Sequence, residues 1–293
     1  MSGPSPDLLI LGASGRVGRL LAAHWAEKGA RVWLQTRDAP VTPALPALRW
    51  SPLEDGATAL ARQLGDRAPR AMVMLLGVTP STPAGGDLAL NARLAAACLD
   101  AATTAGIPRV LLASSSAVYP GGRATPWREE ELAAAAPSPY GEAKRAMEAV
   151  AVPWRDRGLE VCSLRIGNVA GADALLLNAD RPEPQYIDRF SSGGGPVRSY
   201  IGPASLARVI EALATAPDLP TALNVAAPAP VAMADLARTA GGDWRWSAAH
   251  DDAVEHLTLD CTALSRLVHF APAESTAGEI VHQWRACLAQ GIA

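Results

Sequence analysis

Four short apolar runs alternate with alanine- and leucine-rich segments of helical length in the first half of the chain. The runs contain few or no polar residues, as expected of strands covered on both faces, and they span residues 8–11, 32–34, 72–76 and 110–112. The segments between them predict helices over 17–28, 57–64 and 88–105. This order predicts an α/β fold with a Rossmann-type, doubly wound parallel sheet and right-handed crossovers.

The pattern becomes less regular after Val150. Residues 161–166 predict one more strand, and helices are predicted over 206–216, 233–240 and 280–290. The segment 182–196 is rich in Pro, Gly and Ser, which predicts a loop or a flexible edge of a pocket. We therefore expect a sheet domain over residues 1–165. Residues 166–293 should form mainly a smaller C-terminal lobe, with some segments returning to the sheet.

The amino-acid composition indicates which kinds of ligand the protein can bind. Charged residues make up 19% of the chain and the formal net charge is −3, which argues against a nucleic-acid-binding surface and a disordered acidic chain. The cysteines and histidines lack the spacings of metal ligands, so no metal site is expected. The N-terminus does not resemble a secretion signal, and the longest apolar run, 71–78, is too short to span a bilayer. We expect a cytoplasmic protein that binds a small molecule and no membrane.

A glycine-rich loop follows the first apolar run. Gly12 and Gly15 stand between this run and the first predicted helix, and Gly18 lies in its first turn; small residues there let a diphosphate approach the backbone and the free N–H groups of the helix. The spacing G-x-x-G-x-x-G at this place predicts dinucleotide binding. The expected contacts are Gly12, Ser14, Gly15, Arg16, Val17 and Gly18, with Leu76 and Gly77 after the third run.

The end of the second run bears on the choice of nicotinamide cofactor. NAD-binding proteins usually place an acidic residue there to accept hydrogen bonds from the ribose, whereas this chain has Gln35, Thr36 and Arg37. Arg37 can pair with a 2′-phosphate through a charge-assisted contact. The sequence therefore predicts NADP, with Thr36 and Arg37 beside it. NAD, with Arg37 as a solvated surface charge, remains the alternative.

Serines and a Tyr-x-x-x-Lys pair supply the expected chemistry. Three serines, Ser114 to Ser116, follow the fourth run, where ligands bind in such sheets, and a serine there can hydrogen-bond the substrate oxygen. Tyr140 is expected to exchange the proton. Lys144 lies one helical turn later, so its charge should lower the pKa of the phenol and its ammonium can reach the nicotinamide ribose.

These motifs together resemble the extended short-chain dehydrogenase/reductase superfamily, specifically the NAD-dependent epimerase/dehydratase family. The matching residues are Gly12 to Gly18, Asn91, Ser114 to Tyr119, Tyr140 to Lys144 with Glu148, Leu164 to Gly171, and Val197 to Ile201. The resemblance implies a catalytic Ser115, with Ser116 as the alternative, and an oxidoreductase or epimerase with Tyr140 as general acid/base. It also implies that Asn168 contacts the substrate, that Arg198 reaches a substrate diphosphate, and that the protein is a homodimer.

Departures from the family pattern leave two classes of function open. The acidic residue expected after the third strand is replaced around residues 50–52, a later segment reads Gly-Pro-Ala-Ser over 202–205, and the stretch between Asn168 and Arg198 is short. We therefore expect residues 1–165 to bind NAD(P) and 166–293 to form a reduced substrate-binding lobe. The leading hypothesis is hydride transfer between nicotinamide and a secondary alcohol or ketone, possibly of a sugar or nucleotide sugar. The alternative is a non-catalytic NADP(H)-binding sensor or scaffold.

Overall fold

The computed structural model describes residues 7–80, 86–134, 136 and 138–291. Its centre is a seven-stranded sheet in the order β11-β6-β5-β4-β1-β2-β3, in which every neighbouring pair is parallel. The strands are β1 (Leu8–Leu11), β2 (Val32–Thr36), β3 (Ala47–Arg49), β4 (Ala71–Met74), β5 (Arg109–Ser115), β6 (Glu160–Ile166) and β11 (Ala222–Val225). The predicted Rossmann-type α/β fold is confirmed.

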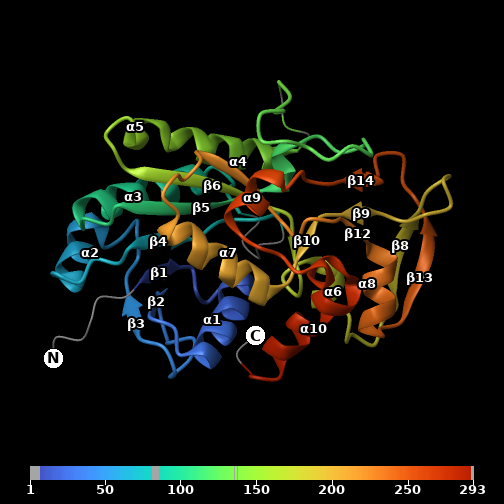
Figure 1. Ribbon diagram of the computed structural model, residues 1–293, viewed down its shortest axis with the longest axis horizontal. Helices are drawn as coiled ribbons and strands as arrows, with labels where there is room; N and C mark the ends of the chain where they lie inside the picture. The colour runs from blue at the N-terminus through green and yellow to red at the C-terminus, as the bar shows by residue number, and fades with distance from the viewer. Residues whose placement is uncertain (1–6, 81–85, 135, 137, 292–293) are drawn as a thin grey trace.

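Helices cover both faces of the sheet (Figure 1). One face carries α2 (Gly56–Leu64), α3 (Leu90–Thr104), α4 (Pro139–Val150) and the short α5 (Val152–Arg155), and the other carries α1 (Arg16–Lys28), α7 (Pro203–Thr215) and α10 (Ala277–Leu288). Strand β1 shows why its sequence has no polar residue. Leu8 and Ile10 pack into the core on one face, whereas Leu9 and Leu11 pack into the core on the other.

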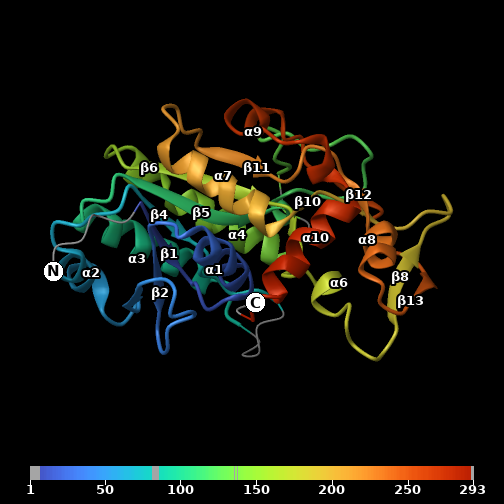
Figure 2. The same cartoon turned by 60° about the horizontal axis from the view of Figure 1, so that its bottom comes forward.

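A smaller lobe extends from one end of the sheet (Figure 2). Its strands are β7 (Asn168–Val169), β8 (Gln185–Arg189), β9 (Val197–Arg198), β10 (Tyr200–Ile201), β12 (Val231–Ala232), β13 (Trp244–Ala248) and β14 (His256–Leu257). They form three small sheets, ordered β10-β7, β13-β8 and β12-β9-β14. The helices among them are α6 (Ala174–Leu177) and α8 (Met233–Ala240). Helix α9 (Thr262–Leu267) packs against β11 of the central sheet, and short 3₁₀ turns span Ser116–Val118 and Pro272–Ser275.

The structure corrects one element of the sequence prediction. The segment 182–196, expected to be a loop, contains strand β8, which pairs in parallel with β13 over five residues. Ile187 is the buried residue of this strand, whereas Tyr186 and Arg189 are exposed, so the five residues carry no period-two pattern and the flanking Pro, Gly and Ser residues favour a loop. Strands β3 and β11 were not predicted. None of the helices described is long and apolar enough to cross a membrane.

Candidate active site

The glycine loop after β1 is closely packed against backbone. Gly12 has φ +80°, and a Cβ there would lie 2.9 Å from the nitrogen of Leu76. A Cβ on Gly18 would lie 2.5 Å from the carbonyl oxygen of Gly12. Only glycine fits these two positions, so the loop leaves a concave backbone surface at the start of α1. This is the shape that a dinucleotide diphosphate requires.

Gln35 fixes the loop from the end of β2. The Gly12 amide donates to its Oε1 at 2.9 Å, and its Nε2 donates to the carbonyl of Trp50 after β3. The side chain is buried and ties together the segments that follow three strands. NAD-binding proteins usually have an acidic residue near this position, which accepts hydrogen bonds from the ribose hydroxyls. This chain has Gln35 instead, and its side-chain amide holds the glycine loop in place.

Tyr140 is placed by the first turn of α4. Ser138 caps this helix by accepting a hydrogen bond from the Gly141 amide at 3.1 Å. A Cβ on Gly141 would collide with the carbonyl oxygen of Ala117, so glycine lets the helix approach the turn after β5. The phenol of Tyr140 is consequently hydrogen bonded to Ser115.

The ionisation of Tyr140 differs from the sequence prediction. Burial raises the pKa of its phenol above the ordinary value, and the hydrogen bond with Ser115 and the charge of Arg16 only partly oppose this effect. Lys144 is not among the groups that lower this pKa; its Nζ lies 5.8 Å from the centre of the Tyr140 ring and donates to the Ala113 carbonyl oxygen at 2.7 Å. Burial also lowers the pKa of Lys144 to about 8, against the raising effect of Glu148.

Most of the predicted site residues line one cavity of about 750 Å³ at the carboxyl ends of β1, β4, β5 and β6. They are Gly12, Ser14, Gly15, Arg16, Val17, Gly18, Gly77, Ser115, Tyr140, Lys144 and Asn168. Thr36, Arg37, Leu76, Ser116 and Arg198 are not among its lining residues. Leu75 lines the cavity in place of Leu76, and Ser115 rather than Ser116 faces Tyr140.

Arg198 points elsewhere. Its guanidinium donates to the carbonyl oxygens of Val254 at 2.6 Å and of Glu255 at 2.9 Å, so it connects β9 with the segment before β14. Burial lowers its pKa, with no carboxylate hydrogen bonded to it among the residues described. The geometry therefore gives Arg198 a structural task within the lobe and does not bring it to the cavity.

Two functional features escaped prediction from sequence. Asp173 lines the cavity next to Asn168, and it accepts hydrogen bonds from the Tyr200 hydroxyl at 2.8 Å and from the Leu175 amide at 3.1 Å. An Asp before a short apolar segment indicates a helix cap, and nothing in the sequence signals its place in the cavity wall. The second feature is the ion pair between Glu148 and Arg165, described below.

A larger hollow of about 1250 Å³ lies between α1, α7 and α10. Its wall includes Leu8 and Val32, which begin β1 and β2. The hollow therefore lies at the amino ends of the strands. Ligands of open α/β sheets bind at the other edge, outside the carboxyl ends. None of the predicted site residues lines it.

The sequence of residues 8–209 matches the model of the "NAD dependent epimerase/dehydratase family". The chain belongs to this family. The match covers more than half of the chain and includes the glycine loop, Ser115, Tyr140 and Lys144. As a member, the protein is an NAD(P)-dependent enzyme of the extended short-chain dehydrogenase/reductase type, and the resemblance seen in the sequence is confirmed.

Solved structures share the fold over nearly the whole chain. MoeE5, solved with UDP-glucuronic acid and NAD, is 23% identical with a TM-score of 0.74, covering 95% of this chain and 99% of its own. UDP-glucose 4-epimerase from Thermotoga maritima, solved with UDP-glucose, is 18% identical with a TM-score of 0.75, covering 96% and 99%. WbmG from Bordetella bronchiseptica, solved with NAD and UDP, is 19% identical with a TM-score of 0.76, covering 99% and 96%. No curated protein matches the sequence significantly.

Proposed function

We propose that this family member transfers a hydride between a nicotinamide cofactor and a secondary alcohol or ketone, as an oxidoreductase or an epimerase. One observation carries the proposal: Ser115, Tyr140 and Lys144 line the same cavity as the glycine loop. A dinucleotide diphosphate fits this loop, because Gly12, Gly15 and Gly18 line the cavity at the start of α1, where the free N–H groups of a helix bind phosphate. The loop would hold the diphosphate, and Tyr140 and Lys144 lie farther along the cavity.

The residues of this chain divide the chemistry among them. The nicotinamide, when bound, accepts or returns the hydride. In the oxidative direction the Tyr140 phenolate takes the hydroxyl proton of the substrate while Ser115 donates a hydrogen bond to the same oxygen. In the reductive direction the neutral phenol gives that proton back to the carbonyl oxygen. Burial raises the pKa of the Tyr140 phenol above its ordinary value, which favours the protonated form that the reductive step needs.

We propose NADP as the preferred cofactor. The support is a pair of arginines at the ends of β2 and β3: Arg37 is exposed, and the Nε of Arg49 donates to its carbonyl oxygen at 3.0 Å. Two guanidinium groups on one exposed edge favour a 2′-phosphate. The neighbouring structures hold NAD, and Asp38 follows Arg37 directly, so NADH is the comparison that the binding experiment must include.

The substrate that we propose carries its reactive alcohol on a sugar. The neighbours solved with UDP-glucuronic acid or UDP-glucose support a sugar. A nucleotide diphosphate has less support in this chain, because Arg198 is bound to backbone carbonyls. The cations in the described lining are Arg16 and Lys144, and residues 1–6, 81–85, 135, 137 and 292–293 contain no Lys or Arg. The turnover assay should therefore compare free sugars with nucleotide sugars as substrates.

Turnover of a substrate panel tests the proposal. The protein is incubated with NADPH or NADP⁺ and with sugar nucleotides, free sugars or simple ketones. Cofactor absorbance follows net oxidation or reduction, and NMR of the products detects epimerisation, which leaves the cofactor unchanged overall. NADPH binding without conversion of any substrate would instead favour the sensor or scaffold hypothesis.

The remaining proposals concern organisation. We propose residues 1–165 as the cofactor-binding part and 166–293 mainly as the substrate-binding lobe, in a cytoplasmic homodimer. The lobe is supported by Asn168 and Asp173, which bring its first segments into the cavity wall. The dimer rests on the family resemblance, and light scattering of the purified protein at several concentrations tests it.

A further inference from the structure

Helix α4 contacts three consecutive residues of β5 through three side chains that are one helical turn apart. Tyr140 is hydrogen bonded to Ser115. Lys144 donates to the carbonyl oxygen of Ala113 at 2.7 Å. The third side chain, Glu148, accepts a hydrogen bond from the hydroxyl of Ser114 at 2.5 Å. The helix and the end of the strand are thus joined at every position that the proposed chemistry uses.

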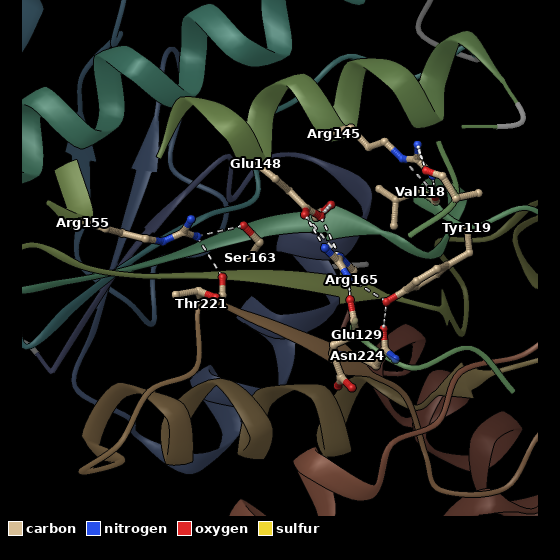
Figure 3. A network of polar contacts seen from close by, with 12 residues as sticks. Val118, Tyr119, Glu129, Arg145, Glu148, Arg155, Ser163, Arg165, Thr221 and Asn224 are labelled. Carbon is tan, nitrogen blue, oxygen red and sulfur yellow. Dashed lines mark hydrogen bonds and ion pairs between the residues drawn. The ribbon is translucent and has the colours of Figure 1, made fainter. Parts of the chain in front are cut away.

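Glu148 is itself held by a buried arginine. Arg165 of β6 donates from Nη2 to Oε2 of Glu148 at 2.8 Å and from Nε to Oε1 at 3.1 Å, as Figure 3 shows. The side chains are 5% exposed for Arg165 and 12% for Glu148. Burying such a pair costs desolvation free energy, and two parallel hydrogen bonds between the guanidinium and the carboxylate offset part of that cost. Removing one partner would leave the other charged and buried.

Arg165 also extends the contact toward the C-terminal part of the chain. Its Nη1 donates to the hydroxyl oxygen of Tyr119 and to the carbonyl oxygen of Glu129, at 2.8 and 2.7 Å. The Tyr119 hydroxyl in turn donates to Oδ1 of Asn224 at 2.8 Å. The hydrogen bonds of Glu148, Arg165 and Tyr119 therefore form one connected network (Figure 3).

We propose that Glu148, oriented by Arg165, is a positioning residue that sets the place of Ser115 through Ser114 and keeps Lys144 in its charged form. The inference rests on the proposed catalytic roles of Ser115, Tyr140 and Lys144. It adds a residue that does not touch the substrate and acts through both of its neighbours. A hydroxyl displaced by a fraction of an ångström from the substrate oxygen loses much of its catalytic effect.

The charge around Lys144 supports the second part of the inference. Burial lowers the pKa of Lys144 to about 8, and Glu148 is the group that raises it. The other polar groups near Lys144 are Tyr140 on its own helix, Ser114 and Ser115 on β5, Asn91 beside Gly77, Arg165 on β6 and Arg16 beyond Tyr140. On the packed helix α3, the charged side chains Arg93 and Asp100 are exposed. Glu148 is thus the acidic group that counters the desolvation of Lys144.

The variant Glu148→Gln tests the inference through its pH profile. In the reductive direction Tyr140 and Lys144 must both be protonated. The kcat/KM of the parental protein should therefore be highest at pH values below 8 and should fall as the pH rises through about 8, the pKa of Lys144. Removing the Glu148 charge should move this falling limb to lower pH by about one unit. At its own optimum, kcat should also fall about 10- to 100-fold through misplacement of Ser115.

The chain offers a matched control at Glu274. This side chain is 9% exposed, accepts from the Ser205 hydroxyl at 2.5 Å and pairs with Arg208 at 2.7 Å, so its chemistry repeats that of Glu148 away from the cavity. Glu274→Gln should lower the melting temperature without moving the pH limb. If Glu148→Gln lowered the melting temperature and left the limb and kcat at the parental values, its role would be structural and the inference would be wrong.

A second variant keeps the test decisive if Glu148→Gln does not fold. Ser114→Ala removes one hydrogen bond and no charge, so kcat should fall while the pH limb stays near 8. Ser205→Ala is its control, because Ser205 makes the corresponding contact with Glu274. Unchanged kcat in Ser114→Ala would overturn the positioning role. Tyr140→Phe is measured alongside, because parental turnover in that variant would overturn the proposed function itself.

Discussion

The ammonium of Lys144 lies 2.7 Å from the carbonyl oxygen of Ala113 and donates to it. This hydrogen bond commits the ammonium to the end of β5. Burial raises the pKa of the Tyr140 phenol, and the groups that oppose this effect are Ser115 and Arg16. The helix spacing alone, with Lys144 one turn after Tyr140, suggested the opposite direction.

Tyr140→Phe tests the proposed acid/base directly. The variant keeps the ring and loses the hydroxyl, so the fold and NADPH binding should survive while turnover falls by about 10²–10⁴. Circular dichroism and cofactor titration provide the controls, and steady-state rates on the active substrate provide the measurement. Turnover at the parental rate would show that another group moves the proton.

Opposite pH dependences are expected in the two directions of reaction. The oxidative step needs the Tyr140 phenolate, and because burial raises the pKa of this group above 10, the oxidative rate should still be rising at pH 10. The reductive step needs the protonated phenol and a charged Lys144, so its rate should fall through about pH 8. Parallel profiles of kcat/KM measure both. A plateau in the oxidative rate well below pH 10 would contradict the raised pKa.

Cofactor preference depends on Arg37. We expect NADPH to bind more tightly than NADH. Arg37→Ala should remove most of that difference and leave the NADH affinity nearly unchanged, because the Arg37 guanidinium would pair with the 2′-phosphate, which NADH lacks. Fluorescence titration with both cofactors gives the ratio. Arg62→Ala, at an exposed position in the last turn of α2, is a charge-matched control. A parental protein that prefers NADH would contradict the assignment.

Arg198→Ala separates a structural arginine from one that binds substrate. The side chain donates to the Val254 and Glu255 carbonyls, and losing such charged hydrogen bonds should lower the free energy of unfolding by about 1.5–3 kcal/mol. The KM for the substrate should change little. Denaturant unfolding and steady-state kinetics measure the two effects. Normal stability with a raised KM for a nucleotide sugar would place Arg198 at a substrate diphosphate.

Local patterns predicted the parts of the site that are contiguous in sequence. The glycine loop requires residues 12–18 only, and the Tyr140 to Lys144 spacing lies within one helix, so both could be located without the structure. Their place at the ends of parallel strands follows from the alternation of strands and helices. The roles of these residues in catalysis stay predictions.

Contacts between distant segments could not be predicted in the same way. The pairing of Glu148 with Arg165 joins a helix to the next strand, and the sequence showed both residues without showing that they meet. Arg198 matches the family pattern in sequence, yet its orientation depends on carbonyl groups 56 and 57 residues away. Strand β8 spans five residues with one buried side chain, Ile187, and its turn-forming neighbours favour a loop.

Strand β11 completes the sheet beside β6, although 55 residues separate Ile166 from Ala222. During synthesis, β6 therefore leaves the ribosome well before its outer neighbour exists. Until then the row of N–H and C=O groups along residues 163–166 has no partner and is a template for association with another nascent chain. A fragment that stops at residue 165 would retain this exposed strand permanently, and we expect it to aggregate even though it contains the glycine loop and the Tyr-Lys pair.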